Sequence, residues 1–253
     1  MRVSASNLAI IAFLITAGCS RPVEKPVSPK IPDLSGTWVR YPENWYGADP
    51  DHPPLPGGAF NLKQPYASQY QALKKREAAA DAAGRPLLNA SAQCLPEGMP
   101  TIMGAIYPIQ ILQTPGQVTV LAEFLTQTRR ILLDTKMPAP DDIAPTYNGT
   151  AVGHYEGDAL VVETRGVRND VRFYDLPHSQ DMIIREQIRH SAPDRIVDEV
   201  TITDPKTLNK PYKFTFEYKK TDYKIQEYIC EKNEIKVDPD GGTEVDLSNV
   251  ANK

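Results

Sequence analysis

The stretch that decides the fold is Tyr212-Lys-Phe-Thr-Phe-Glu-Tyr-Lys219, in which aromatic and polar residues alternate without interruption. Successive side chains of a β-strand point to opposite faces of the sheet, so this pattern predicts a strand with four aromatic rings on one face. Similar alternation extends back along the chain to Ile106. A first strand is expected near the N-terminus, at 34–40. The alternation predicts the others at 107–113, 118–125, 128–133, 149–156, 159–165, 182–190, 195–203 and 223–230.

Short connections join these predicted strands. Pro115-Gly116, Gly157-Asp158 and Lys220-Thr-Asp222 are turn-forming sequences of the kind that link antiparallel neighbours. An antiparallel set of about ten strands commonly closes into a barrel or folds into a sandwich, because an open sheet would leave unpaired edges. The sequence therefore predicts a mainly β protein, built as an antiparallel meander. The strand pattern alone does not decide between a barrel and a sandwich.

One helix is expected at 65–83, between the first predicted strand and the others. Tyr66, Tyr70 and Leu73 are spaced as i, i+4 and i+7, which places them on one helical face, and Gly84 is a stop signal. We expect the tyrosines to serve packing rather than ligand binding. Long loops rich in proline separate this helix from the strands on both sides.

Length and charge limit the class of protein. The 253 residues include 28 basic and 32 acidic side chains, which gives a formal net charge of −4. No stripe of Lys and Arg interleaved with aromatic residues stands out, so we expect no nucleic-acid partner. Residues 34–233 are expected to form a single β domain with a sizeable core. Residues 234–253 are expected to be an acidic, disordered tail.

The N-terminus has the features of an export signal. Arg2 precedes an apolar run of about ten residues, which is too short to span about 30 Å of hydrocarbon as a helix, and small residues then lead to Cys19. This arrangement resembles a bacterial lipoprotein signal, in which residues 1–18 are removed and Cys19 is lipidated. Ser20 resembles the sorting position of outer-membrane lipoproteins, so we expect an outer-membrane anchor facing the periplasm, with 19–33 as a Pro-rich tether. An ordinary secretory signal is the alternative.

Two further cysteines remain once Cys19 is assigned to the anchor. Cys94 and Cys230 would lie in an oxidising compartment, where two cysteines most simply form one disulfide. Such a bridge would join the loop that begins at Cys94 to the last predicted strand. Two unrelated thiols are the alternative.

Charged side chains interrupt the apolar faces of three predicted strands. Glu123, Glu186 and Glu227 each occupy a face otherwise filled by Leu, Ile, Met or Tyr, and a buried carboxylate is costly unless it is paired. The available cationic partners are Arg129, Arg130, Arg189, His154 and His178. If a barrel interior gathers them, the result is a polar cluster in an aromatic-lined cavity, which is how small-molecule sites are built. Ion pairs without a ligand, or a sandwich with partly exposed faces, are the alternatives.

Several short motifs occur together between residues 34 and 233. They are Cys94-Leu-Pro-Glu-Gly-Met-Pro100, Gln113-Thr-Pro-Gly116, Arg129-Arg-Ile131, Asn148-Gly149, Gly153-His-Tyr-Glu-Gly-Asp158 with Leu160-Val-Val-Glu-Thr164, Pro177-His-Ser179 and Glu227-Tyr-Ile-Cys-Glu231. As a set they resemble a large, mostly uncharacterised family of bacterial secreted proteins and lipoproteins. The resemblance implies an extracytoplasmic, lipocalin-like β-barrel and candidate site positions, without an activity. The family pattern has Trp where Tyr155 and Tyr212 stand here.

Two main function classes follow from these residues. In the first, the protein is an acid–base enzyme whose expected catalytic residues are His154, Glu186, His178 and Arg129: a histidine moves a proton, Glu is its partner, and Arg holds a developing anion. The expected ligand-binding residues are Glu123, Glu227, Arg130, Tyr147, Asn148 and Tyr155. Elimination, hydration, isomerisation or hydrolysis of a small oxygenated organic molecule would fit. In the second class, the protein binds such a molecule without converting it; a structural envelope protein is a third possibility.

No cofactor is expected. The chain has no Gly-rich phosphate loop and no Gly-x-Ser-x-Gly nucleophile motif. Its histidines lack the close spacing of metal ligands, so no metal is expected either. Only a convergence of His154, His178 and Glu186 in space would provide a set of metal ligands.

Overall fold

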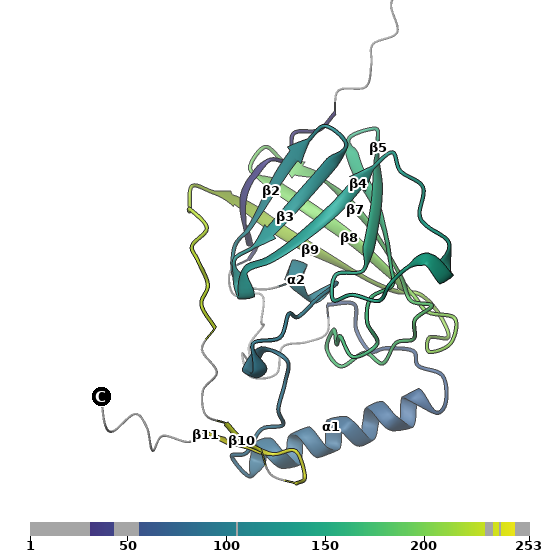
Figure 1. Ribbon diagram of the computed structural model, residues 1–253, viewed down its shortest axis with the longest axis vertical. Coiled ribbons are helices and arrows are strands. Elements are labelled where there is room, and N and C mark those ends of the chain that lie inside the picture. Colours follow the sequence, from purple (N-terminus) through teal and green to yellow (C-terminus); the bar gives the residue numbers. More distant parts are fainter. Residues whose placement is uncertain (1–30, 43–55, 105, 231–234, 238, 246–253) are drawn as a thin grey trace, which may run out of the picture.

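The computed structural model describes residues 31–42, 56–104, 106–230, 235–237 and 239–245 (Figure 1). The predicted signal peptide, Cys19 and most of the predicted tether lie outside the described residues.

A closed barrel of nine strands forms the body of the protein, with each strand paired to its neighbours in chain order and the last paired to the first. The strands are β1 (Gly36–Arg40), β2 (Ile109–Thr114), β3 (Gln117–Ala122), β4 (Gln127–Leu133), β5 (Thr150–Glu156), β6 (Ala159–Arg165), β7 (Ile183–Ala192), β8 (Arg195–Thr203) and β9 (Tyr212–Thr221). The predicted mainly β meander is therefore confirmed, and its closure is a barrel rather than a sandwich.

One neighbouring pair in the barrel is parallel. β4 and β5 run in the same direction, with Ile131 opposite Ala151. Strand directions cannot alternate all the way around a ring with an odd number of strands, so at least one pair must be parallel. Residues 134–149, which include the 3-10 turn η3 (Pro140–Asp142), carry the chain back along the barrel between these strands. Parallel neighbours need a connection of about a dozen residues or more, and this loop meets that length.

Alternate positions of the strands fill the barrel interior. On β9 the rings of Tyr212, Phe214, Phe216 and Tyr218 are buried, as the alternation predicts, and the Phe214 and Phe216 rings meet edge to face at 5.0 Å. Burying a side chain of this size stabilises a fold by about 1.5–3 kcal/mol. The facing strands contribute Trp38, Ile109, Ile111, Val118, Val120, Ile131, Leu160, Val162, Ile184, Ile188, Ile196, Val200 and Ile202.

A one-turn helix, α2 (Thr101–Gly104), closes the lower end of the barrel in Figure 1. Its Ile102 and Met103 side chains are buried, and the Tyr218 hydroxyl donates to the Met103 carbonyl oxygen at 2.6 Å. A Cβ at Gly104 would lie 2.9 Å from the Phe216 ring, so a glycine lets the helix approach the core. We call this end of the barrel the base.

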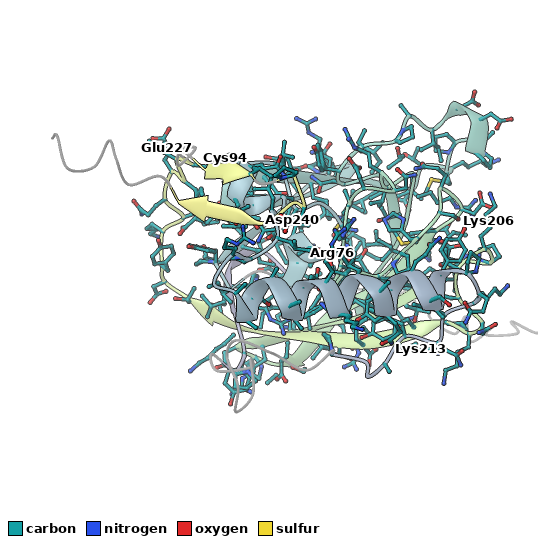
Figure 2. All side chains as sticks on the ribbon, turned by 90° about the horizontal axis from the view of Figure 1, so that it is seen from below. Arg76, Cys94, Lys206, Lys213, Glu227 and Asp240 are labelled. Carbon is teal, nitrogen blue, oxygen red and sulfur yellow. A yellow bond between two sulfur atoms is a disulfide. The ribbon has the colours of Figure 1, made fainter. Side chains whose placement is uncertain are left out.

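The long helix α1 (Tyr66–Ala82) lies across the base, outside the barrel (Figures 1 and 2). The predicted helix is confirmed within a residue at each end. None of its residues is buried, so the expected packing of Tyr66, Tyr70 and Leu73 is partial; Tyr70 meets the Phe60 ring edge to face at 5.6 Å. The helix therefore stands off the barrel and leaves space beneath it.

The N-terminal end of the described chain lies at the opposite end of the barrel from α1 (Figure 1). There the ring Nε2 of His190 lies 2.8 Å from the Asp33 carbonyl oxygen, and the Leu34 amide donates to the Gln113 side chain at 2.6 Å. A chain that enters the barrel from residue 31 thus arrives far from the base.

The predicted strand 223–230 is wrong. β9 already has both edges paired, one with β8 and the other with β1, so the residues after Thr221 have no sheet edge to join. They run along the outside of the barrel instead (Figure 1). We call residues 222–230 the C-terminal strap.

The predicted strand 118–125 is too long. β3 ends at Ala122, and Glu123 starts the 3-10 turn η2 (Phe124–Thr126), in which Leu125 has a φ of +55°. Glu123 is buried because the strap covers it: its carboxylate accepts hydrogen bonds from the Gln226 amide at 2.9 Å and from the Tyr223 hydroxyl at 3.2 Å. Its burial therefore comes from the strap and not from the barrel interior.

The predicted disulfide is present. Cys94, which follows the 3-10 turn η1 (Ser91–Gln93), is bonded to Cys230 at the end of the strap, with 5.6 Å between their Cα atoms. The bridge ties the strap to the base.

The expected disorder of residues 234–253 is wrong for part of that segment. Strands β10 (Ile235–Val237) and β11 (Thr243–Val245) form a hairpin beside α1 (Figure 1). The Thr243 hydroxyl donates to the Pro86 carbonyl oxygen, and its amide donates to the same oxygen at 3.0 Å. These bonds to the loop after α1 order the hairpin despite its polar composition.

Candidate functional site

Two of the sequence-predicted residues meet inside the barrel. Arg129 from β4 and Glu186 from β7 form a two-pronged ion pair across the interior, with Nη1 donating to Oε1 at 2.8 Å and Nη2 to Oε2 at 2.5 Å. Nη2 also donates to the Thr164 hydroxyl on β6 at 3.0 Å. The Arg129 side chain is 1% exposed and that of Glu186 is 0% exposed. Closure of the barrel brings these residues together from positions 57 apart in the sequence.

A second carboxylate lies beside this pair. Asp198 on β8 is fully buried, and burial together with the neighbouring Glu186 carboxylate holds the pKa of Asp198 well above its ordinary value. The Arg40 guanidinium, also buried, lies 4.5 Å from the centre of the Phe216 ring. The cluster of Arg40, Arg129, Glu186 and Asp198 links four strands within the core, which is the arrangement expected of buried ion pairs without a ligand.

His154 points away from this cluster. It lies on the outer face of β5, where its side chain is 55% exposed and its Nε2 is 3.8 Å from Glu156. The inward positions of this strand include Ala151 and Gly153, and a Cβ at Gly153 would lie 2.9 Å from the Val161 carbonyl oxygen and 3.0 Å from the Ile131 side chain. The expectation that His154 joins Glu186 in the interior is therefore wrong, because small residues form the inner face here.

Three other predicted residues also lie away from the cluster. Glu227 is exposed on the strap, and Glu123 lies beneath the strap. Tyr155 is on the inner side of β5 near the end opposite the base, where its hydroxyl accepts a hydrogen bond from the Gln113 amide at 2.6 Å. The structure does not gather the three predicted glutamates, and His154, His178 and Glu186 do not converge on a metal position. Among the residues described, no three His, Cys, Asp or Glu side chains could hold a metal ion.

Three of the predicted ligand-binding residues do share one cleft. Arg130, Tyr147 and Asn148 line a hollow of about 420 Å³ on the outside of the barrel, between the start of β4 and the loop that leads into β5. The Asn148 amide donates to the Thr128 carbonyl oxygen at 3.2 Å, and the Arg168 guanidinium covers the Tyr147 ring at 4.7 Å. The Asn148 side-chain nitrogen and the Tyr147 ring are thus engaged with the protein, whereas the buried Asn148 side-chain oxygen has no hydrogen-bond partner among the described residues.

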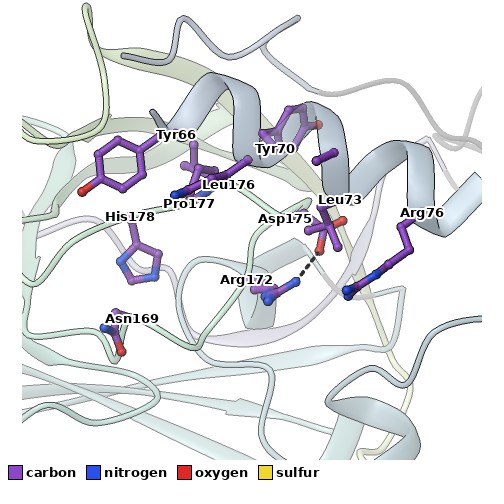
Figure 3. Close-up of a pocket in the computed structure, with 12 residues that line it drawn as sticks. Tyr66, Tyr70, Leu73, Arg76, Asn169, Arg172, Asp175, Leu176, Pro177 and His178 are labelled. Atoms are coloured by element: carbon purple, nitrogen blue, oxygen red, sulfur yellow. Dashed lines mark ion pairs between the residues drawn. The ribbon is translucent and has the colours of Figure 1, made fainter. Parts of the chain in front are cut away.

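His178 lies in a different and larger cleft, formed beneath α1 (Figure 3). We call this cleft and its continuation the α1 groove. The first half has a volume of about 530 Å³ and is lined by α1 and by residues 169–178. The second half, of about 510 Å³, extends to residues 87–97 and shares Leu73, Arg76, Arg172 and Asp175 with the first. The shared residues place the two halves side by side beneath α1.

The α1 groove combines apolar walls with two arginines. Leu73 and Leu176 are among its apolar residues, and the side chains of Arg76 and Arg172 extend into it from opposite walls (Figure 3). Arg172 is 3.7 Å from Asp175, whose other oxygen binds Lys74 of α1 at 3.0 Å. Arg76 forms no ion pair within the described parts of the chain. In the groove, the Arg172 guanidinium is thus shared with the Asp175 carboxylate, whereas the Arg76 guanidinium is available to a ligand.

His178 is held in place by the backbone. Its Nε2 is 2.8 Å from the Val171 carbonyl oxygen, and its Nδ1 is 3.2 Å from the carbonyl oxygen of Ser179. A carbonyl oxygen only accepts hydrogen bonds, so the closer contact fixes a proton on Nε2. The Ser179 hydroxyl and amide in turn donate to the buried Asp204 carboxylate, the amide at 2.5 Å. The His178 ring is therefore held in place in the wall of the α1 groove.

Sequence reasoning missed several residues that the structure makes prominent. Asp198 shares strand parity with the apolar residues Ile196 and Val200, so the face analysis that found Glu186 could have found it. Arg76 follows Leu73 by three residues and therefore lies on the same helical face. Arg172 lies in a loop without periodicity, and no sequence signal indicates its position.

No protein-family model matches the chain, and no curated protein matches it. Within the described residues, no helix has the length and apolar character needed to cross a membrane.

Proposed function

We propose that the protein is an extracytoplasmic lipoprotein that binds a small organic anion in the α1 groove. Such a ligand would place its anionic group, most simply a carboxylate, between Arg76 and Arg172, and its carbon skeleton against Leu73, Leu176 and the Tyr70 ring. Most ligand sites are apolar clefts with a small number of placed polar groups, and the α1 groove has that composition.

The observation that carries this proposal is the pair of arginines facing one cleft. A guanidinium binds a carboxylate through two parallel hydrogen bonds, and a site with two guanidiniums favours an anion over a neutral molecule. Arg76 is available for this role because it has no ion-pair partner in the described residues. The Arg129–Glu186 pair offers no such group, because each charge already satisfies the other.

Binding without conversion accounts for the groove better than acid–base catalysis. A catalytic histidine needs a ring nitrogen that can exchange a proton with the ligand. Both ring nitrogens of His178 face backbone carbonyl oxygens, at 2.8 and 3.2 Å. The other predicted catalytic residues, His154, Glu186 and Arg129, lie outside the groove.

The proposed anchor is compatible with this site. In the proposal, Cys19 carries the lipid and holds the protein at the outer membrane, facing the periplasm. The described chain enters the barrel at the end opposite α1 (Figure 1). The anchored end of the chain and the α1 groove would therefore lie at opposite ends of the barrel.

The test is a binding screen with isothermal titration calorimetry. Small aliphatic and aromatic carboxylates are compared with their uncharged amides. We expect the carboxylates to bind and the amides to bind at least tenfold more weakly, because a hydrogen bond to a charged group contributes about 1.5–3 kcal/mol. Arg76→Gln and Arg172→Gln should each weaken carboxylate binding about tenfold or more.

Lys75→Gln is the matched control, because Lys75 is the neighbouring cation on α1 and is absent from the lining of the groove. It should bind carboxylates as the unaltered protein does. Nuclear magnetic resonance spectra of each bound ligand after long incubation should show it unchanged. Equal affinity for acids and amides would refute the anion site, and steady conversion of a ligand would refute binding without catalysis.

A further inference from the structure

The second half of the α1 groove contains a carboxylate that no cation satisfies. Glu97 lines it, and the one hydrogen bond to its side chain in the described structure comes from the Ser91 hydroxyl at 3.1 Å. Among the described residues, no Lys, Arg or His lies within ion-pair distance of Glu97. This is unusual for a partly buried acid, which is normally paired.

The backbone holds Glu97 firmly in the wall of the groove. The next residue, Gly98, has a φ of +70°, and its amide donates to the Gln127 side chain at 3.2 Å. The Met99 amide donates to the Tyr147 carbonyl oxygen at 3.0 Å. A Cβ at Gly98 would lie 2.3 Å from that same oxygen, so this close contact requires glycine. The backbone that carries Glu97 is therefore held in place before any ligand arrives, which lowers the entropy cost of binding.

Glu97 and Arg76 line the same half of the groove with opposite charges. Neither forms an ion pair in the part of the chain that the structure describes, and they do not pair with each other. Two opposite, separated and unsatisfied charges in one cleft form the complement of a molecule that carries both charges at a distance.

We infer that the ligand of the α1 groove is a zwitterion of the amino-carboxylate class, with its ammonium group on Glu97 and its carboxylate on Arg76 and Arg172. This inference rests on the proposed function, because it uses the same arginines for the anionic end. It adds a cationic end to the ligand and assigns a specificity-determining residue to recognise it.

Burial raises the pKa of the Glu97 carboxyl from its ordinary value, because the charged form loses contact with water. A ligand ammonium placed beside it would stabilise the charged form. Binding through the ammonium group should therefore weaken as the pH falls and Glu97 takes up a proton.

The test compares two series of molecules by calorimetry. One series consists of unbranched ω-amino acids of increasing chain length, and the other of the matched carboxylic acids with a methyl group in place of the amine. At the length that spans Glu97 and Arg76, we expect the amino acid to bind about tenfold or more tightly than its matched acid. This advantage should shrink as the pH is lowered.

Glu97→Gln should abolish the advantage of the amino acid and its pH dependence. Glu199→Gln, a change to an exposed acid on the barrel wall, should keep both; thermal unfolding confirms that each variant is folded. If the matched acids bind and respond to Arg76→Gln but the amine adds nothing at any length, the zwitterion inference is overturned and the proposed function stands. If neither series binds, both are overturned.

Discussion

Replacement of Glu186 by Gln tests whether the buried pair serves stability or ligand binding. In the folded protein the Glu186 side chain is 0% exposed, and its carboxylate accepts both hydrogen bonds of the Arg129 fork, at 2.8 and 2.5 Å. The change leaves a buried guanidinium without its counterion, which costs about 3–5 kcal/mol. Asp198 lies beside the pair and can ionise in place of Glu186, so we expect a loss near the lower end of that range.

Urea unfolding monitored by protein fluorescence measures this loss. Glu186→Gln should lower the free energy of unfolding by about 3 kcal/mol, and the double variant with Asp198→Asn should lower it further, because no carboxylate then remains beside Arg129. Replacing both members of the pair, by Arg129→Met with Glu186→Leu, should restore much of the stability, since apolar side chains fill the space without a stranded charge. A loss below about 1 kcal/mol for Glu186→Gln, together with loss of ligand binding, would refute this reasoning and return Glu186 to the predicted site.

The remaining predictions concern the proton on Asp198, the disulfide, one glycine and the anchor. Because burial raises the folded pKa of Asp198, this carboxyl keeps a proton that the unfolded chain releases above the ordinary value of 3.8, so stability falls as the pH rises above that value. The melting temperature of Asp198→Asn, measured relative to that of the unaltered protein, should therefore climb as the pH is raised above about 4, and a constant difference would contradict the raised pKa. Replacing Cys94 and Cys230 by alanine opens a loop with a sequence separation of 136, and urea unfolding should show a loss of up to about 5 kcal/mol; an unchanged midpoint would contradict a structural role. Gly98→Ala forces a side chain onto a residue at φ +70° and should cost at least about 1–3 kcal/mol in the same assay, so a neutral result would count against the close approach of its loop. Cys19→Ser should release the protein from the membrane fraction, and failure of the unaltered protein to incorporate radiolabelled fatty acid would end the lipoprotein hypothesis.

The sequence by itself determined most of the local structure. Alternation over 212–219 placed the aromatic face of β9, because a residue's parity in a strand decides which side of the sheet it faces. Helix signals placed α1 within a residue at each end, and the count of two cysteines besides Cys19 predicted the disulfide. These features depend on neighbouring residues or on composition, so the chain reveals them directly.

Which face of a strand points into the barrel was decided only by the tertiary structure. In β5, parity groups His154 with Val152, and this pattern fits an inner face as well as an outer one. Ala151 and Gly153 face inward because the barrel wall is crowded there, with the Val161 backbone and the Ile131 side chain close to Gly153. That crowding comes from other strands, and strand parity alone does not record it.

Closure of the barrel decided the path of the C-terminal strap and the positions of the two residue clusters. Residues 223–230 alternate like a strand, yet β1 occupies the edge of β9 that they would need. The cluster around Arg129 and the α1 groove are both made from residues far apart in the chain. Arg129 and Glu186 meet across the interior, while Arg76, Glu97 and Arg172 line one groove because α1 lies across the base. Local periodicity carries no information about such contacts, since they depend on which elements the closed barrel brings side by side.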